Sequence, residues 1–219
     1  MSESTAECIR LYVERHYLSA AQLAERASCT VERLCALQLA QCIPVHSYEL
    51  RSSHLFSSTF GDHAVAGQPQ RYYHPSVLGW LRTALDRAAG SPLAAVARRY
   101  REDFERDFEI ALAGREPPWP GGVDYAWAYL MDGTWGLCLK EISAQNMLLK
   151  EFARGLIRRA NRRPPGAELS AAQRAELAQA VADYRRVVLP FAPHERERSS
   201  SVLELAPALT RLAANRPGG

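Results

Sequence analysis

The sequence predicts a mainly α-helical protein with one small β-wing. Most of its 219 residues lie in segments whose apolar side chains recur every three or four positions, which is the period of an amphipathic helix. Several of these segments begin at a Ser or Thr that can cap the first turn. Residues 46–73 are instead rich in Ser, Gly and His and partly alternate in polarity, which predicts a hairpin or an irregular wing. We expect two domains, residues 1–90 and 91–219, and about seven helices.

Three short helices are expected before the wing. Residues 4–17 carry an apolar and aromatic stripe, and Ser19 with Gln22 has the spacing of a capping box for the second helix. Thr30 is placed to cap the third helix, which the pattern extends to residue 41. Two short helices joined by so tight a turn predict a helix-turn-helix over residues 19–41.

Pro and Gly mark the limits of the later helices. Those after the wing are predicted to span residues 75–88, 92–113 and 171–188, and a last helix begins near Ser201. Residues 123–159 lie between the predicted helices at 92–113 and 171–188. They form the densest apolar and aromatic segment of the chain, which we call the hub. Its Asp132-Gly133 pair predicts a turn because glycine takes a positive φ without steric cost. A buried irregular piece should follow the turn, and then a helix from Ser143.

The first 90 residues or so carry a resemblance to a known family. The helix-turn-helix at 19–41, the Ile43-Pro44 exit and Arg71-Tyr72-Tyr73 before the next helix resemble the DNA-binding domain of MerR-type regulators. The wing is longer here than is usual in that family. The resemblance implies a winged helix-turn-helix domain followed by a helical domain, and a ligand-responsive regulator that reads DNA as a homodimer.

The charges argue against DNA as a partner. The chain has a formal net charge of only +3, and residues 1–47 hold four Arg against five Glu. A helix in the major groove needs cationic phosphate contacts and donors for base edges. The candidate recognition helix offers only Arg33, Gln38 and Gln41. The helix-turn-helix is therefore interpreted as a structural unit, and the regulator remains the alternative.

Cysteine usage and the N-terminal residues also indicate the cellular compartment. None of the five cysteines forms a Cys-x-x-Cys pair, and the polar, acidic N-terminus does not look like a secretory signal. We expect reduced thiols in a cytoplasmic protein. No apolar run is long enough to predict a membrane span.

The wing carries the first cluster of candidate functional side chains. His63 and His74 are the candidate metal ligands, for zinc or iron, because imidazoles beside a carboxylate suit both metals. The spacing matches no known metal motif, so the alternative is that His74 caps the following helix and the other histidines are exposed. Tyr48, Arg51 and Tyr73 are the candidate ligand-binding residues of this region.

The hub carries the remaining candidates. Asp132, Thr134 and Trp135 could line a pocket, or Asp132 could simply form the turn. Cys138 is better interpreted as a core thiol than as a nucleophile, since no nearby cation obviously lowers its pKa. Lys150 stands one helical turn from Arg154, an arrangement suited to an anionic ligand, although a solvated basic face is the simpler interpretation.

A second resemblance covers about residues 10–160. The helix-turn-helix, Tyr72-Tyr73-His74-Pro75 and the run from Asp132 to Cys138 resemble a family of small, uncharacterised proteins encoded in bacterial natural-product gene clusters. The resemblance implies a role in secondary-metabolite biosynthesis but carries over no catalytic residue. The leading hypothesis is thus a protein that processes a small molecule in a pocket between wing and hub. His63, His74 and Asp132 are its candidates for acid–base roles.

Overall fold

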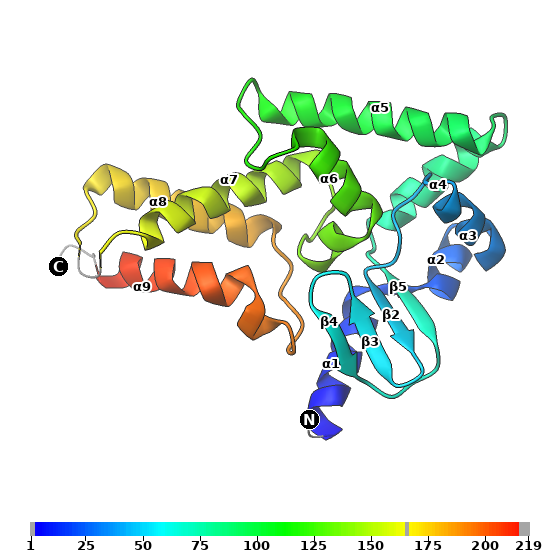
Figure 1. The fold of residues 1–219 in the computed structure, drawn as a ribbon, viewed down its shortest axis with the longest axis horizontal. Coiled ribbons are helices and arrows are strands. Elements are labelled where there is room, and N and C mark those ends of the chain that lie inside the picture. The colour runs from blue at the N-terminus through cyan, green and yellow to red at the C-terminus, as the bar shows by residue number, and fades with distance from the viewer. Residues whose placement is uncertain (1–2, 165–166, 215–219) are drawn as a thin grey trace.

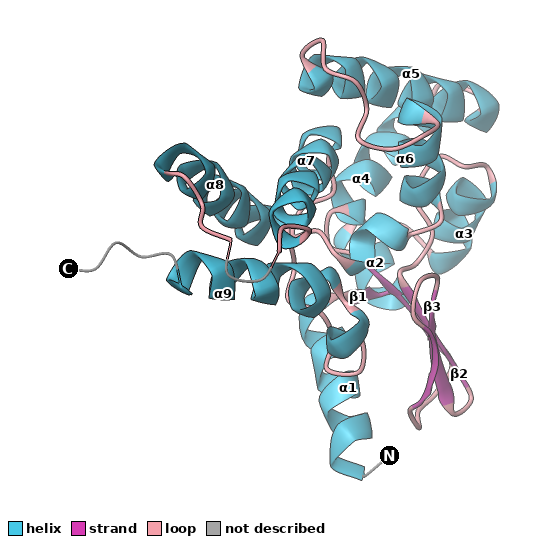
Figure 2. Ribbon diagram, turned by 60° about the vertical axis from the view of Figure 1, so that its left-hand side comes forward, coloured by secondary structure: helices cyan, strands magenta, loops and turns pink. Residues whose placement is uncertain are grey.

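The computed structural model describes residues 3–164 and 167–214. Helices make up 61% of the structure, and strands, which join in one five-stranded antiparallel sheet, make up 10% (Figures 1 and 2). In Figure 1 the long helices lie above the sheet and to its left, and α7 (Ala144–Asn161) leads from the middle of the molecule towards the left-hand end. Within the described ranges, no helix has both the length and the apolar character needed to cross a membrane.

The N-terminal helices form where the capping signals predict them. They are α1 (Glu3–His16), α2 (Ala20–Arg26) and α3 (Val31–Leu39). Ser19 and Gln22 form the predicted capping box, and the Thr30 side chain accepts the Arg33 backbone N–H at 3.2 Å. The helices are confirmed, but their presence does not confirm a helix-turn-helix motif.

The sheet is built from five very short strands in the order β1-β5-β2-β3-β4. They are β1 (Leu18–Ser19), β2 (Tyr48–Arg51), β3 (His54–Ser57), β4 (Gly61–Ala64) and β5 (Gln70–Tyr73). In β2 burial alternates, with Tyr48 and Leu50 pointing inward. These side chains pack against Ile9 and Val13 of α1 and against Leu137 of the hub, so the sheet shares a core with both.

The prediction of a mainly α protein with a small wing is wrong, because the fold is mixed α/β. The stretch 46–73 folds into four strands, and the dipeptide between α1 and α2 adds a fifth by pairing Leu18 with Tyr73. A dipeptide has no periodicity to detect, and strands of four residues with exposed polar faces barely show one. Long-range pairing, rather than local pattern, makes this sheet.

The rest of the chain is helical around a second core. The α-helices are α4 (Val77–Ala88), α5 (Leu93–Leu112), α6 (Gly122–Met131), α7 (Ala144–Asn161), α8 (Ala171–Val187) and α9 (Ala206–Ala214). A 3-10 turn covers Thr134–Leu137, a second covers Arg196–Arg198 and a π-turn covers Ser201–Leu205. Ser143 caps α7, and Ser170 with Gln173 forms the predicted capping box of α8. Helices α7 and α8 pack side by side, with α9 beneath them in Figure 1.

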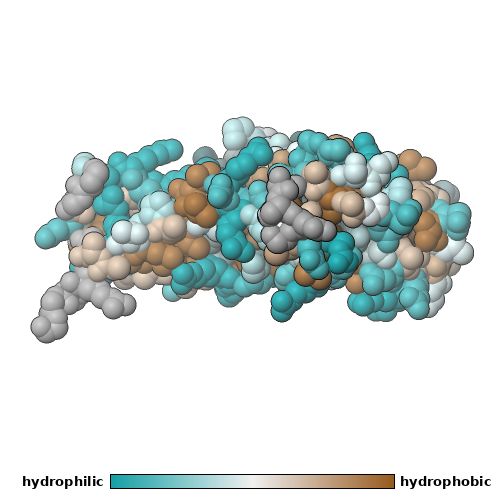
Figure 3. Space-filling view, turned by 90° about the horizontal axis from the view of Figure 1, so that it is seen from below, coloured by the Kyte–Doolittle hydropathy of each residue, from teal (hydrophilic) through white to brown (hydrophobic). Residues whose placement is uncertain are grey.

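Seen from below, polar and apolar residues are interspersed over most of the surface (Figure 3). The exposed apolar side chains include Leu39 on α3, Ile110 on α5 and Leu203 in the turn before α9. They come from separate elements. The predicted boundary at residue 90 falls between α4 and α5, and the division into two domains stays a prediction.

Candidate functional site

The turn at Asp132–Gly133 brings the hub against the base of the sheet. Val45 N donates to Met131 O at 2.9 Å, and Ser47 Oγ donates to Gly133 O at 3.0 Å. Gly133 has φ +79°, and a Cβ on it would lie 2.5 Å from His46 O. Glycine is therefore required both for the left-handed backbone and for the close approach of the preceding loop.

Beyond this turn lies a cavity of about 270 Å³, which we call the hub cavity. It opens between the β3–β4 turn, the hub and residues 191–200. Six of its sixteen lining residues are aromatic: Phe60, Trp119, Tyr125, Tyr129, Trp135 and Phe191. The rings contact one another in pairs, with centroids 5.8 Å apart for Trp119 and Trp135 and 4.3 Å apart for the stacked Tyr125 and Tyr129. These contacts hold the walls in fixed positions.

A buried lysine lies in this aromatic setting. Lys150 is only 6% exposed, although it lines the cavity. Its Nζ donates to Glu151 Oε1 at 2.9 Å and lies 5.1 Å from the centroid of the Trp135 ring. The interpretation of Lys150 as part of a solvated basic face is therefore wrong. The ion pair and the ring face offset the cost of removing the ammonium from water.

The ion pair of Lys150 and Glu151 continues into a larger network of charges. Arg154 lines the cavity and donates to both oxygens of Glu204, at 2.7 Å each. Arg158 donates to the same carboxylate at 2.9 Å, and Arg154 also reaches Glu151 at 3.4 Å. Helix α7 thus presents its charged face to the cavity and is tied by Glu204 to the turn before α9.

The protonation states follow from burial and from these pairs. Burial by itself would lower the pKa of Lys150. Cys138, once ionised at high pH, and the Glu151 carboxylate outweigh this effect, so the pKa of Lys150 lies above its usual value. Burial likewise works against ionised Glu151, yet Lys150 and Arg154 bring the pKa of this carboxyl below its usual value. Burial raises the pKa of the Cys138 thiol. At neutral pH the cavity therefore presents the Lys150 ammonium, the Glu151 carboxylate and the neutral Cys138 thiol. This state of Cys138 agrees with its interpretation as a core thiol rather than a nucleophile.

Three predicted site residues line this cavity, namely Thr134, Trp135 and Lys150. The Thr134 and Ser58 hydroxyls lie 2.7 Å apart and join the hub to the β3–β4 turn. Asp132 is exposed and does not line the cavity. Its Oδ1 accepts the Thr134 N–H at 2.9 Å, which is the behaviour of a turn-forming residue.

The ligand-binding candidates of the wing lie elsewhere. Tyr48 is buried on the inner face of the sheet. Arg51 is exposed, pairs with Glu49 and lines a shallow surface depression together with Tyr73. The Tyr73 hydroxyl donates to Gln38 Oε1 at 2.8 Å, which ties the sheet to α3. Sequence alone could not separate these positions from the hub cavity.

The two candidate metal ligands are not brought together. His63 is in β4 and His74 follows β5, and β3 and β2 lie between those strands. Three strand spacings of about 4.8 Å place them roughly 14 Å apart across the sheet, and His63 lies level with Gln70, four residues before His74, so an offset along the strands adds to this distance. Among the residues that the structure describes, no group of three or more His, Cys, Asp and Glu side chains is arranged to hold a metal ion.

His74 instead has a structural role. Its side chain is 2% exposed, and its Nδ1 accepts the backbone N–H of Ser76 at 3.1 Å at the start of α4. Burial lowers the pKa of His74 to about 4, so the ring is neutral near pH 7. This is the helix-capping role that stood as the alternative to metal binding.

Sequence reasoning missed the buried carboxyl of Glu195. The run from His194 to Arg198 is strongly charged and predicts an exposed loop, yet Glu195 is fully buried. The Tyr48 hydroxyl lies 2.8 Å from each Glu195 oxygen, and His194 Nε2 lies 3.5 Å from Oε1. Burial raises the pKa of Glu195 to about 7. No local pattern signals this position, because the burial is created by strands almost 140 residues earlier.

Glu195 does not line the hub cavity itself, but it lies in the middle of a segment that does. Phe191, Arg198, Ser199 and Ser200 on either side of it line the cavity. Its hydrogen bond with Tyr48 fastens this segment to the sheet. Beside it, the rings of His194 and His63 lie 4.1 Å apart, and His194 Nδ1 is buried without a hydrogen-bond partner.

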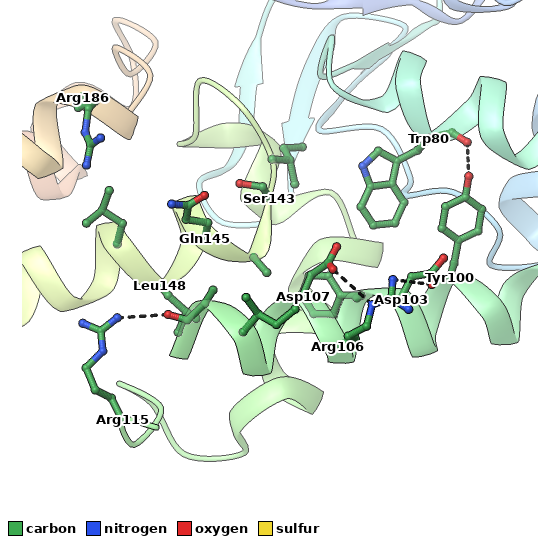
Figure 4. A pocket seen from close by; sticks show the side chains of 16 residues that line it. Trp80, Tyr100, Asp103, Arg106, Asp107, Arg115, Ser143, Gln145, Leu148 and Arg186 are labelled. Carbon is green, nitrogen blue, oxygen red and sulfur yellow. Dashed lines mark hydrogen bonds and ion pairs between the residues drawn. The ribbon is translucent and has the colours of Figure 1, made fainter. Parts of the chain in front are cut away.

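A wider cavity of about 800 Å³ lies between α5 and the start of α7 (Figure 4). Its charged side chains are exposed or already paired with protein. Asp103 accepts hydrogen bonds from Arg87 and Arg106, and the Tyr100 hydroxyl donates to Trp80 O at 2.6 Å. Arg115 donates to backbone carbonyls of α5. No buried charge points into this groove, so the smaller hub cavity is the better candidate site.

Comparison with known proteins gives one partial match. The chain is similar to a family of unknown function, DUF6058, over residues 119–206. That range contains every residue that lines the hub cavity except Thr59 and Phe60. No curated protein and no solved structure matches the chain significantly.

Proposed function

We propose that the protein binds a small molecule in the hub cavity and takes part in its processing. The observation that carries the proposal is the buried ammonium of Lys150 in a cavity with aromatic walls. Binding sites for small molecules are typically concave and largely apolar, with a few polar groups that fix the orientation of the ligand. The hub cavity has these properties, and its volume lies just below the usual range for drug-sized ligands.

The protonation states favour binding over covalent catalysis by the cavity's own side chains. An ammonium has no lone pair with which to form a Schiff base, and a neutral thiol is a weak nucleophile. Lys150 and Cys138 are both held in those forms. We therefore favour an accessory role, in which the protein holds or delivers the molecule. The setting in bacterial secondary metabolism is part of the proposal and rests on the sequence resemblance alone.

The regulator alternative gains no support from α3. Gln38, one of its three polar candidates for base contacts, is engaged with Tyr73, and Leu39 beside it is 87% exposed. An apolar side chain at this position contributes no phosphate contact. DNA binding therefore remains unexpected.

Ligand-observed NMR with mixtures of small aromatic acids, amides and amines tests the proposal. We expect hits with the wild-type protein that Thr134→Phe abolishes, because Thr134 lines the hub cavity and the larger ring takes up space within it. The matched control is Ile110→Phe in the wider cavity, which should retain the same hits. Hits that survive Thr134→Phe and disappear in Ile110→Phe would place binding in the wrong cavity and refute the proposal.

A further inference from the structure

We propose that the ligand of the hub cavity is a flat aromatic acid with a single anionic headgroup, and that Lys150 binds this headgroup. The inference rests on the proposed function and adds the chemical class of the ligand. It is carried by the charge balance of the cavity, by the position of the ammonium and by the shape of the walls.

The charge balance favours an anion. Three cations line the cavity, Lys150, Arg154 and Arg198, against the single carboxylate of Glu151. Glu204 lies outside the lining and offsets one further charge through Arg154. The set therefore carries one excess positive charge, or two when the exposed Arg158, which shares Glu204, is included. An anion would offset this excess, whereas a cation would add to the repulsion.

The Lys150 ammonium is placed to make the contact. An ammonium has three donors; one is directed to Glu151 and a second reaches the Cys138 sulfur, which leaves one for a ligand. The ammonium also lies over the face of Trp135, which fixes its position above an aromatic surface. A carboxylate bound there would receive a charge-assisted hydrogen bond, which is stronger than a hydrogen bond between neutral groups.

The walls favour a flat aromatic body. The Trp119 and Trp135 rings are tilted by 48° to each other, and Phe60 and Phe191 meet edge to face with centroids 5.9 Å apart. Tyr125 and Tyr129 remain more than a third exposed, although they stack on each other and line the cavity. Aromatic rings pack on one another in offset or edge-to-face arrangements, and a planar ligand can extend this cluster.

Isothermal titration calorimetry with three probes of matched shape tests the inference. The probes are 2-naphthoate, 2-naphthamide and 2-naphthylmethylamine, which carry a negative, a neutral and a positive group at neutral pH. We expect wild-type protein to bind the naphthoate at least about 10-fold more tightly than the amide, since a hydrogen bond to a charged group contributes more than a neutral one. The amine should bind most weakly.

Two lysine substitutions give the decisive comparison. Lys150→Met should weaken naphthoate binding by roughly 10- to 100-fold and weaken amide binding far less, because the amide loses a hydrogen bond but no charge pairing. The control is Lys140→Met, which removes the other lysine of the chain. Lys140 is exposed, and its Nζ donates to Arg185 O and Arg186 O outside the cavity. This variant should bind all three probes as the wild type does.

Glu151→Gln keeps the test open if Lys150→Met does not fold. It removes the competing carboxylate and retains the ammonium, so the preference for naphthoate over amide should increase; a decrease contradicts the inference. Tighter binding of the amide or the amine by wild-type protein leaves the proposed function intact and overturns the inference. If none of the three probes binds, the proposed function fails and the inference fails with it.

Discussion

Replacing Trp135 with alanine is expected to lower the free energy of unfolding by about 3–5 kcal/mol. Trp135 is 5% exposed and belongs to the larger hydrophobic core. Its Nε1 donates to Ala126 O at 3.0 Å, and its ring supports both Trp119 and the Lys150 ammonium. Truncation to alanine leaves a cavity beneath these groups and also exposes the buried charge. Urea denaturation followed by circular dichroism measures the loss.

Trp135→Phe is the matched control for that measurement. It retains an aromatic ring and loses the hydrogen bond to Ala126 O, a carbonyl that keeps its helical position inside α6, so a loss of about 0.5–1.5 kcal/mol is expected. Equal losses in the two variants would mean that the hydrogen bond, rather than packing, accounts for the effect. A loss below about 1 kcal/mol for Trp135→Ala would show that the ring is not packed in the core as described.

Replacing Glu195 with glutamine is expected to change the pH dependence of stability by on the order of 3 kcal/mol between pH 5 and 8. Burial raises the pKa of Glu195 from 4.5 to about 7, so the folded protein binds a proton that the unfolded chain releases in this interval. Wild-type stability from this group is therefore present at low pH and is lost as pH rises towards 7. Glutamine cannot ionise and avoids the loss, and one pH unit corresponds to about 1.4 kcal/mol.

The measurement is the difference in unfolding free energy between variant and wild type at several pH values. Burial lowers the pKa of His74 and of His194 to about 4. The folded protein therefore loses the stability that these two neutral histidines contribute as the pH falls below about 6.5. The effect of His74 is the same in both proteins, so its contribution cancels in the difference. The difference should favour Glu195→Gln increasingly from pH 5 to 8. A difference that is constant over this range contradicts a buried carboxyl with a raised pKa.

The helices were predictable because their signals are local. Ser19 with Gln22 and Ser170 with Gln173 each define a helix start within four residues, and the structure confirms both capping boxes. The sheet was not predictable in the same way. Its strands are two to four residues long, and Leu18 acquires its partner Tyr73 only when the fold brings distant segments together.

The residues of the candidate site also divide into those that a local pattern indicates and those that only the fold brings together. Thr134, Trp135 and Lys150 could be selected from sequence because they belong to one dense segment, where a turn, aromatic residues and a rare lysine coincide. Glu195 could not, because it lies in a charged run whose burial depends on Tyr48 and Ser57 of the sheet. His63 and His74 are close in sequence, but antiparallel pairing separates them by two strands.

The central claim is that the hub cavity is the binding site, and ¹⁹F NMR of 5-fluorotryptophan-labelled protein tests it most directly. The chain has four tryptophans, which single Trp→Phe substitutions assign. Trp119 and Trp135 line the hub cavity, Trp80 lines the wider cavity, and Trp127 lines neither. Addition of 2-naphthoate should shift the Trp119 and Trp135 resonances and leave those of Trp80 and Trp127 in place. A shift at Trp80 alone, or no shift at saturating probe, would contradict the claim.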